Sequence, residues 1–146
     1  MLLEIDARGI APVEHVQRML ADGQRVMGFG HRVYKTMDPR APILRAFSRG
    51  LGERAGETRW YRMSEEILAA VKAEKGIDPN VDFFSASTYH ALGIPPDLFT
   101  PIFAIARVSG WAAHVEAQYA ANRLIRPRTK YVGERDLRYI PLDDRG

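Results

Sequence analysis

Residues 26–40 read Val-Met-Gly-Phe-Gly-His-Arg-Val-Tyr-Lys-Thr-Met-Asp-Pro-Arg, and Gly28 and Gly30 flank Phe29 just before His31. Glycine reaches backbone torsions closed to other residues and lets a ligand approach the main chain. Histidine titrates near neutrality, so His31 on such a loop can donate a hydrogen bond or a proton to a substrate oxygen. On the residues alone, a surface loop with a structural histidine is the alternative.

The same loop carries three basic residues, Arg32, Lys35 and Arg40. Lys35 and Arg40 lie within reach of the same site. The Asp38-Pro39 step fixes the turn that directs Arg40, because proline restricts its own φ and the conformation of the residue before it. The pattern therefore predicts an anion-binding loop with an acid–base histidine.

Composition places the chain among globular proteins, with 146 residues of which 46% are hydrophobic and 27% are charged. The net charge of +3 suits an anionic ligand, but the basic residues are scattered, so neither nucleic acid nor a membrane is the expected partner. Cysteine is absent and no His/Asp/Glu cluster has ligand spacing, so no metal is expected. Without a signal peptide or an apolar run of spanning length, we expect a soluble cytoplasmic protein.

Apolar residues recur at helical spacing through most of the chain, and no strand-like alternation persists. On residues 41–55 the predicted apolar face comprises Ile43, Leu44, Phe47 and Leu51. Asn80 is the expected N-cap of the helix that carries Asp82 in its first turn, where the helix dipole favours a charged carboxylate. The sequence predicts an all-α fold, with helices over residues 1–7, 12–21, 41–55, 61–75, 81–92 and 97–122.

The loop at 26–40 strongly resembles the signature loop of the citrate synthase family, which includes the 2-methylcitrate synthases. Residues 79–85 (Pro-Asn-Val-Asp-Phe-Phe-Ser), residues 99–111 and the tail from Asn122 to Gly133 resemble the same family at its spacing. The resemblance covers essentially the whole chain, but only the C-terminal part, well under half, of a full-length member. The family's Leu-His-Gly-Gly-Ala motif, whose histidine is catalytic, is expected before Met1.

The resemblance implies a citrate synthase-like, all-α arrangement of domains. Residues 1–11 would be the end of a preceding helix, and residues 12–94 a small CoA-binding helical domain that includes the signature loop at 26–40. Residues 95–146 would be C-terminal helices and the tail of the large domain. The tail is too polar to pack by itself, so it needs a partner surface.

The reaction that the resemblance implies is the condensation of acetyl-CoA with oxaloacetate to give citrate and CoA, an acyl transfer. Asp82 matches the family's base, which removes a proton from the thioester's methyl group, and its apolar neighbours Phe83 and Phe84 could shield it. From the residues alone, helix capping is the alternative role for Asp82. His31 matches the donor that polarises the ketone of oxaloacetate.

Three arginines match the family's substrate-binding residues through the motifs Asp-Pro-Arg, Ile-Ala-Arg and Ile-Arg-Pro: Arg40, Arg107 and Arg126. Arginine binds carboxylates at two points, which suits a dianion. Arg107 interrupts an apolar run, so it needs a partner or a ligand, and a structural ion pair is the alternative. In the family, the arginine matching Arg126 reaches the neighbouring subunit's site, which implies a homodimer.

Coenzyme A enters the resemblance as a co-substrate and not as a tightly bound cofactor. The family binds it largely through the backbone, here at Gly28, Phe29 and Gly30, with Lys35 as a nearby basic side chain. Propionyl-CoA is the alternative substrate of a 2-methylcitrate synthase. A truncated, non-catalytic module that binds CoA or dimerises is the other alternative. For the isolated chain we expect a dimer, a higher oligomer or an assembly with an N-terminal portion, with weak CoA binding and slow citrate formation.

Overall fold

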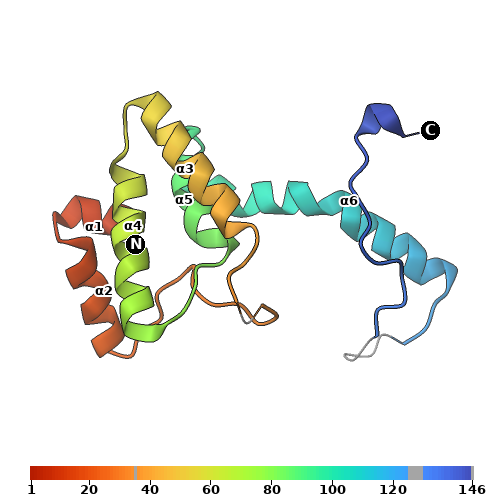
Figure 1. The fold of residues 1–146 in the computed structure, drawn as a ribbon, viewed down its shortest axis with the longest axis horizontal. Helices are drawn as coiled ribbons and strands as arrows, with labels where there is room; N and C mark the ends of the chain where they lie inside the picture. The colour runs from red at the N-terminus through yellow and green to blue at the C-terminus, as the bar shows by residue number, and fades with distance from the viewer. Residues whose placement is uncertain (35, 125–129, 146) are drawn as a thin grey trace. The chain divides into compact units, whose positions relative to one another are not determined.

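The computed structural model describes residues 1–34, 36–124 and 130–145, and helices account for its regular structure (Figure 1). In this part of the chain no strand forms, and residues 29 and 79 make an isolated antiparallel bridge. The all-α prediction is confirmed. The elements are α1 (Leu2–Arg8), α2 (Pro12–Ala21), α3 (Ala41–Ala55), α4 (Arg59–Lys75), α5 (Val81–Ala91), the short 3₁₀ helix η1 (Pro96–Leu98), α6 (Phe99–Ala120) and the 3₁₀ helix η2 (Leu142–Asp144).

The chain folds as two compact units, Met1–Ala106 and Arg107–Gly146, which divide within α6. The first unit holds α1 to α5, η1 and the beginning of α6. The second holds the remainder of α6 and the tail. The domain boundaries predicted after residues 11 and 94 refer to the domains of a full-length family member, and they stay predictions.

Helix α4 is the centre of the first unit, because it packs against α1, α2, α3 and α5 (Figure 1). Its buried side chains follow the spacing expected of one helix face. Each large apolar side chain that is fully buried contributes about 1.5 to 3 kcal/mol to folding. Together with buried side chains from the neighbouring elements, those of α4 form the hydrophobic core, which holds the surrounding helices in place. The core consists of Ile5, Val16, Val26, Trp60, Met63, Ile67, Ala70, Val71, Phe83 and Phe84.

Helix α3 meets α5 at Ser48 and Leu44 and not at Ile43 or Phe47. Ser48 is buried and Leu44 partly buried, whereas Ile43 is 58% and Phe47 57% exposed. The Ser48 and Ser87 hydroxyls hydrogen-bond at 2.7 Å across the interface. The predicted packing face is therefore wrong for Ile43 and Phe47. Small side chains allow a close approach of two helices, and that approach decides which face is covered.

Helix α6 has no buried residue in the described chain, and it runs unbroken through Gly110. The stretch Pro96–Ala120 includes an 18-residue window of mean hydropathy 1.2, so its length and composition suffice to cross a membrane. The expectation that no apolar stretch reaches this length is wrong here, because Arg107 and Glu116 interrupt the run without lowering its average enough. The core helices of soluble proteins meet the same criterion. The large apolar side chains that α6 exposes are Phe103, Ile105, Val108, Trp111, Val115 and Tyr119.

The loop between α2 and α3 is fastened to the segment that precedes α5. The Gly30 N–H donates to the Asp78 carbonyl at 3.0 Å, and the Asn80 N–H donates to the Gly28 carbonyl at 2.9 Å. Gly28 has a φ of 89°, and a Cβ there would lie 2.9 Å from the Cα and side chain of Phe83. The absence of a side chain at Gly28 therefore lets the loop approach α5 closely.

Replacing Gly28 by alanine is expected to destabilise the protein by about 2 to 4 kcal/mol, because the clash of the new Cβ with the backbone of α5 adds to the strain of a positive φ. Gly23→Ala is the matched control, since Gly23 has a φ of 70° with no atom within 4 Å of an added Cβ. It should cost only the backbone strain, about 1 kcal/mol. Urea unfolding measures both, and equal losses would contradict the packing role of Gly28.

Candidate active site

His31 is held by the main chain of its own loop. The N–H groups of Val33 and Tyr34 both donate to His31 Nδ1 at 3.1 Å, and the His31 and Tyr34 rings lie 4.6 Å apart between centroids. In the neutral ring a nitrogen that accepts carries no hydrogen, so Nε2 carries it and acts as a donor. The side chain is exposed. His31 therefore offers an oriented N–H to a ligand.

A cavity of about 220 Å³ opens beside His31. Part of its wall is the loop itself and part is the segment that precedes α5, so the bridge between these segments shapes it. It is the place where the histidine, a carboxylate and main-chain groups meet. Its lining includes Gly30, His31, Tyr34, Thr36, Asp38 and Asp78.

Asp38 is a buried carboxylate, 1% exposed, that joins the loop to α5. Its Oδ1 accepts from the Arg40 N–H at 3.0 Å and from Arg40 Nε at 2.9 Å. Its Oδ2 accepts from Arg40 Nη2 at 2.8 Å and from the Val81 N–H at 3.1 Å. The Arg40 guanidinium above all, together with both N–H groups, lowers the pKa of Asp38 to about 2, against the opposing effect of burial. Asp38 is therefore ionised at neutral pH.

Arg40 precedes the first residue of α3, and its side chain is 38% exposed. Pairing with Asp38 raises the pKa of Arg40, and the charges of Tyr34 and Asp82 add to this effect. The described hydrogen bonds to Asp38 use Nε and Nη2, so the Nη1 edge remains for a ligand. Sequence reasoning attributed the aim of Arg40 to the Asp38-Pro39 turn and missed the carboxylate, although an Asp that bonds a main-chain N–H two residues later is a known turn signal.

Asp82 lies in the first turn of α5, and the predicted cap of this helix is confirmed. Asn80 Oδ1 accepts from the Asp82 N–H at 3.0 Å, and Asn80 Nδ2 donates to the Gly30 carbonyl at 2.9 Å. The capping side chain is thus Asn80, and its second bond, to the loop, was not predicted. The expected shielding of Asp82 is wrong, since Phe83 and Phe84 turn into the core and Asp82 is exposed.

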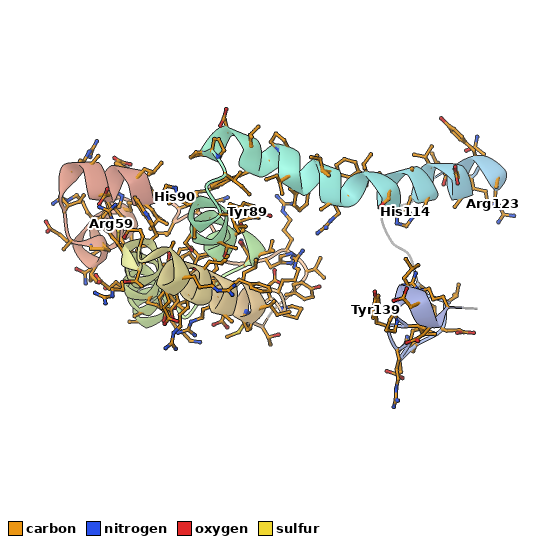
Figure 2. The ribbon with its side chains drawn as sticks, turned by 90° about the horizontal axis from the view of Figure 1, so that it is seen from above. Arg59, Tyr89, His90, His114, Arg123 and Tyr139 are labelled. Atoms are coloured by element: carbon orange, nitrogen blue, oxygen red, sulfur yellow. The ribbon has the colours of Figure 1, made fainter. Side chains whose placement is uncertain are left out.

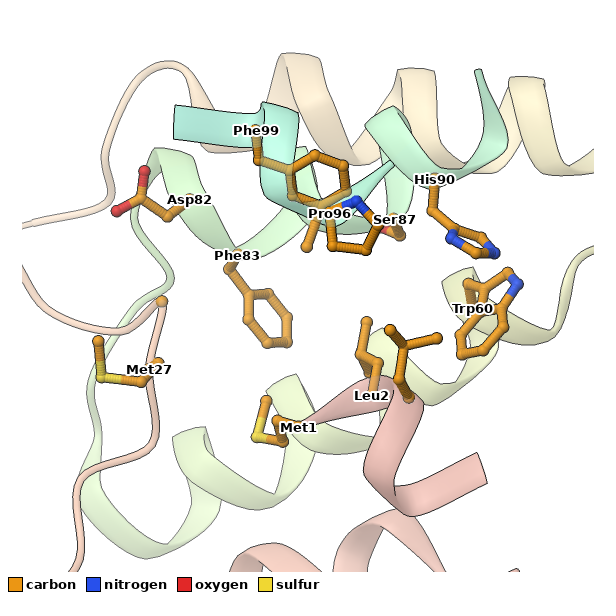
Figure 3. A pocket seen from close by; sticks show the side chains of 13 residues that line it. Met1, Leu2, Met27, Trp60, Asp82, Phe83, Ser87, His90, Pro96 and Phe99 are labelled. Atoms are coloured by element: carbon orange, nitrogen blue, oxygen red, sulfur yellow. The ribbon is translucent and has the colours of Figure 1, made fainter. Parts of the chain in front are cut away.

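Asp82 lies at the edge of an apolar cavity of about 260 Å³ (Figure 3). The Asp82 carboxylate points away from the Phe83 ring, which lies in the middle of the view (Figure 3). A second cavity, of about 410 Å³, is also lined by Asp82. A ligand could therefore approach this carboxylate from the side of either cavity. The first cavity is lined mainly by apolar groups, among them Met27, Trp60, Phe83, Ala86, Pro96 and Phe99.

The other predicted site residues are Phe29, Arg107, Lys35 and Arg126, and the structure describes the first two of them. The Phe29 ring packs on Phe83 with 4.5 Å between centroids. Arg107 lies partly buried on α6 and belongs to the second unit, so its approach to His31 stays a prediction. Lys35 and Arg126 lie outside the described residues.

Two further histidines, His90 and His114, are placed by the structure. His90, on α5, lies edge-on to Trp60 with 4.6 Å between ring centroids, and it lines the apolar cavity (Figures 2 and 3). His114 is exposed on α6 (Figure 2). Within the described ranges, no three His, Cys, Asp or Glu side chains are grouped to hold a metal ion.

Comparison with known proteins identifies the class. Residues 1–128 match the family model of the citrate synthase C-terminal domain, and the chain belongs to the citrate synthase family. A citrate synthase of Haloferax volcanii is 56% identical over 145 residues, which cover 99% of this chain and 38% of that protein. The 2-methylcitrate synthase 2 of Corynebacterium glutamicum is 48% identical over 120 residues, covering 82% of this chain and 31% of that protein.

A solved structure agrees with this membership. The citrate synthase of the thermophilic archaeon Thermoplasma acidophilum, a ternary complex with carboxymethyl coenzyme A and oxaloacetate, superposes with a TM-score of 0.63 at 37% identity. The match covers 91% of this chain and 38% of that one. The chain therefore spans well under half the length of these relatives, and the fold of this part is the family's.

The low pKa of Asp38 predicts a defined acid sensitivity. Because its folded-state pKa of about 2 lies below the ordinary 3.8, its ionisation stabilises the fold above about pH 4, and this contribution is lost as the pH falls from about 4 to about 2. We expect a contribution of about 1 to 2 kcal/mol, discounted because Arg40 is partly exposed. Urea unfolding between these pH values should show a steeper loss for the wild type than for Asp38→Asn. Parallel curves would contradict this prediction.

Proposed function

We propose that this chain carries part of the condensing site of a citrate synthase, which joins acetyl-CoA to oxaloacetate and releases citrate and CoA. The observation that carries the proposal is the fixed ring of His31, whose Nδ1 is occupied by two N–H groups while Nε2–H is presented from an exposed side chain. A ketone needs such a donor, because negative charge develops on its oxygen during the attack.

Oxaloacetate is a dianion, so its carboxylates need cations with a fixed orientation. Arg40 is oriented by Asp38 and retains an outward edge, and we assign it to one carboxylate. Arg107 and Arg126 are proposed as further clamps on the basis of their motifs. With the two carboxylates held, the ketone oxygen would meet His31 Nε2–H, and neither group needs to rearrange during the reaction.

Asp82 is proposed as the base that removes a proton from the methyl group of the thioester. The enolate then attacks the ketone carbon, and water cleaves the resulting thioester to release CoA. The exposure of Asp82 next to an apolar wall supports this role, since the thioester can reach the carboxylate while its acyl group meets apolar side chains.

CoA is proposed to bind as a co-substrate at the turn of Gly28, Phe29 and Gly30, with Lys35 near its phosphates. The described hydrogen bonds already use the Gly28 carbonyl and both main-chain groups of Gly30. The coenzyme would therefore meet the N–H of Gly28 and the main chain of Phe29. The complex of the Thermoplasma relative with a CoA derivative supports CoA as the co-substrate.

We also propose the setting in which this site works: a cytoplasmic homodimer, or an assembly with an N-terminal portion of the enzyme. In this proposal residues 12–94 form a small CoA-binding domain and residues 95–146 belong to a large one. The exposed apolar side chains of α6 support an assembly, because patches of this kind are normally covered by another chain or segment. Trp111 and Val115 are half-exposed examples.

The test is oxaloacetate-dependent release of CoA from acetyl-CoA, followed with a thiol reagent. The chain has no cysteine, so CoA is the only thiol formed. Asp82→Asn and His31→Asn should each lower the rate about 10²- to 10³-fold, through loss of the base and of the oxyanion donor. Arg18→Gln, which removes an exposed ion pair with Glu14, is the control and should be unchanged. Unaltered rates in both site variants would contradict the proposal.

A second candidate function is 2-methylcitrate synthesis from propionyl-CoA, which the Corynebacterium relative's name favours. The two thioesters differ by one methylene, so discrimination is limited to about 10- to 200-fold. We expect acetyl-CoA to be accepted. Comparing kcat/KM for the two thioesters decides between the functions, and turnover of propionyl-CoA without any citrate from acetyl-CoA would reverse the assignment.

A further inference from the structure

We propose that Asp38 is a positioning residue for the substrate dianion, which ties the Arg40 guanidinium and the first turn of α5 into one rigid element. The inference rests on the proposed function, since it assigns Arg40 to a carboxylate and Asp82 to the base. It adds a residue that acts through Arg40 and does not touch the substrate itself.

The first step is the orientation of Arg40. An arginine side chain has many rotamers, and a two-point contact with a carboxylate fixes the plane of its guanidinium. Asp38 makes this contact through both oxygens, at 2.9 Å to Nε and 2.8 Å to Nη2, and it also accepts the Arg40 N–H. Because Asp38 is only 1% exposed, water competes little for these bonds. Arg40 is thus held in one geometry before substrate arrives.

The second step is the link to α5. The first N–H groups of a helix have no partner within the helix. In α5, Asp38 accepts the Val81 N–H, and Asn80 accepts the Asp82 N–H while donating to the Gly30 carbonyl. The Asp38–Val81 and Asn80–Gly30 bonds therefore connect the start of α5 to the loop of residues 26–40. Asp38 alone contacts Arg40 as well, so it fixes the cation relative to the turn that carries Asp82.

Two carboxylates, those of Asp38 and Asp82, compete for the positive charge of Arg40. Asp38 binds Arg40 by hydrogen bonds, whereas Asp82 acts on it through its charge. In the described contacts Asp82 has no hydrogen bond to Arg40. Asp38 occupies Nε and Nη2 and supplies the negative charge that pairs with the guanidinium. The Asp82 carboxylate therefore need not pair with Arg40 and is left for the thioester.

The experiment uses Asp38→Asn in the full chain and reads the binding of oxaloacetate and of CoA separately by calorimetry. The variant should weaken oxaloacetate binding about 10- to 100-fold, because the guanidinium loses its fixed orientation, and should leave CoA binding unchanged. Glu65→Gln is the matched control, since Glu65 makes a two-point contact with Arg45 between α3 and α4, outside the proposed site. It should lose stability without losing affinity for oxaloacetate. Equal oxaloacetate affinity in Asp38→Asn and Glu65→Gln would overturn the inference.

A double-mutant cycle tests whether Asp38 acts through Arg40. In an Arg40→Lys background, Asp38→Asn should have little further effect on oxaloacetate binding, because the two residues act as a unit. Additive losses would overturn the inference. A second measurement needs no variant: the Arg40 Nε–H and the Val81 amide should each exchange more slowly in the folded protein than in the unfolded chain, measured by NMR, because each donates to the buried Asp38 carboxylate. An unprotected Arg40 Nε–H would overturn the inference even if Asp38→Asn failed to fold.

The two proposals fail in different ways. If the wild type binds oxaloacetate but its turnover is unaffected by Asp82→Asn and His31→Asn, the proposed catalytic function is contradicted, while the affinity comparison still decides the role of Asp38. If the wild type binds no oxaloacetate, the assignment of Arg40 is wrong and the inference is overturned with it.

Discussion

The candidate site depends on the fastening of residues 28–30 to residues 78–80. Two main-chain hydrogen bonds and the Asn80 side chain join these segments. The contact requires that Gly28 lack a Cβ, since Phe83 occupies the space where one would lie. His31 follows this contact on one side and Asp82 follows it on the other. Together with the Asp38–Val81 hydrogen bond and the packing of Phe29 on Phe83, the fastening sets the spacing between the two residues.

The contact between residues 28–30 and 78–80 is stabilised by the hydrophobic core around α4, to which Phe83 and Phe84 belong. Phe83 and Phe84 are buried from the same turn of α5 that exposes Asp82, so hydrophobic packing fixes the orientation of this turn. The exposed ion pairs contribute far less, typically below about 1 kcal/mol each. Arg18–Glu14 and Arg49–Glu53 are pairs of this kind. Asp38 differs, because its carboxylate is buried and bonded on both oxygens.

Membership of the citrate synthase family is the basis on which functions are proposed for His31, Arg40 and Asp82. The relatives share the fold of this part of the chain, and this chain spans 38% of the Haloferax protein. A loop that orients a histidine, a buried carboxylate that orients an arginine and a capped helix that presents an aspartate are separate devices. The proposed reaction would need all three, because in it a ketone is polarised while a carbon acid loses its proton.

The sequence by itself determined the helices and the family. The predicted bounds of α2 and α3 agree with the structure, as do the end of α4 before Gly76 and the Asn80 cap, because proline, glycine and capping signals act over a few neighbouring residues. Only the tertiary structure decided that α3 packs through Ser48, that Asp38 directs Arg40 and reaches α5, and that Asp82 is exposed. The Ser48–Ser87 and Asp38–Val81 contacts join residues 39 and 43 positions apart. Periodicity along one helix cannot reveal which distant side chain it will meet, and that meeting settles the burial of each face.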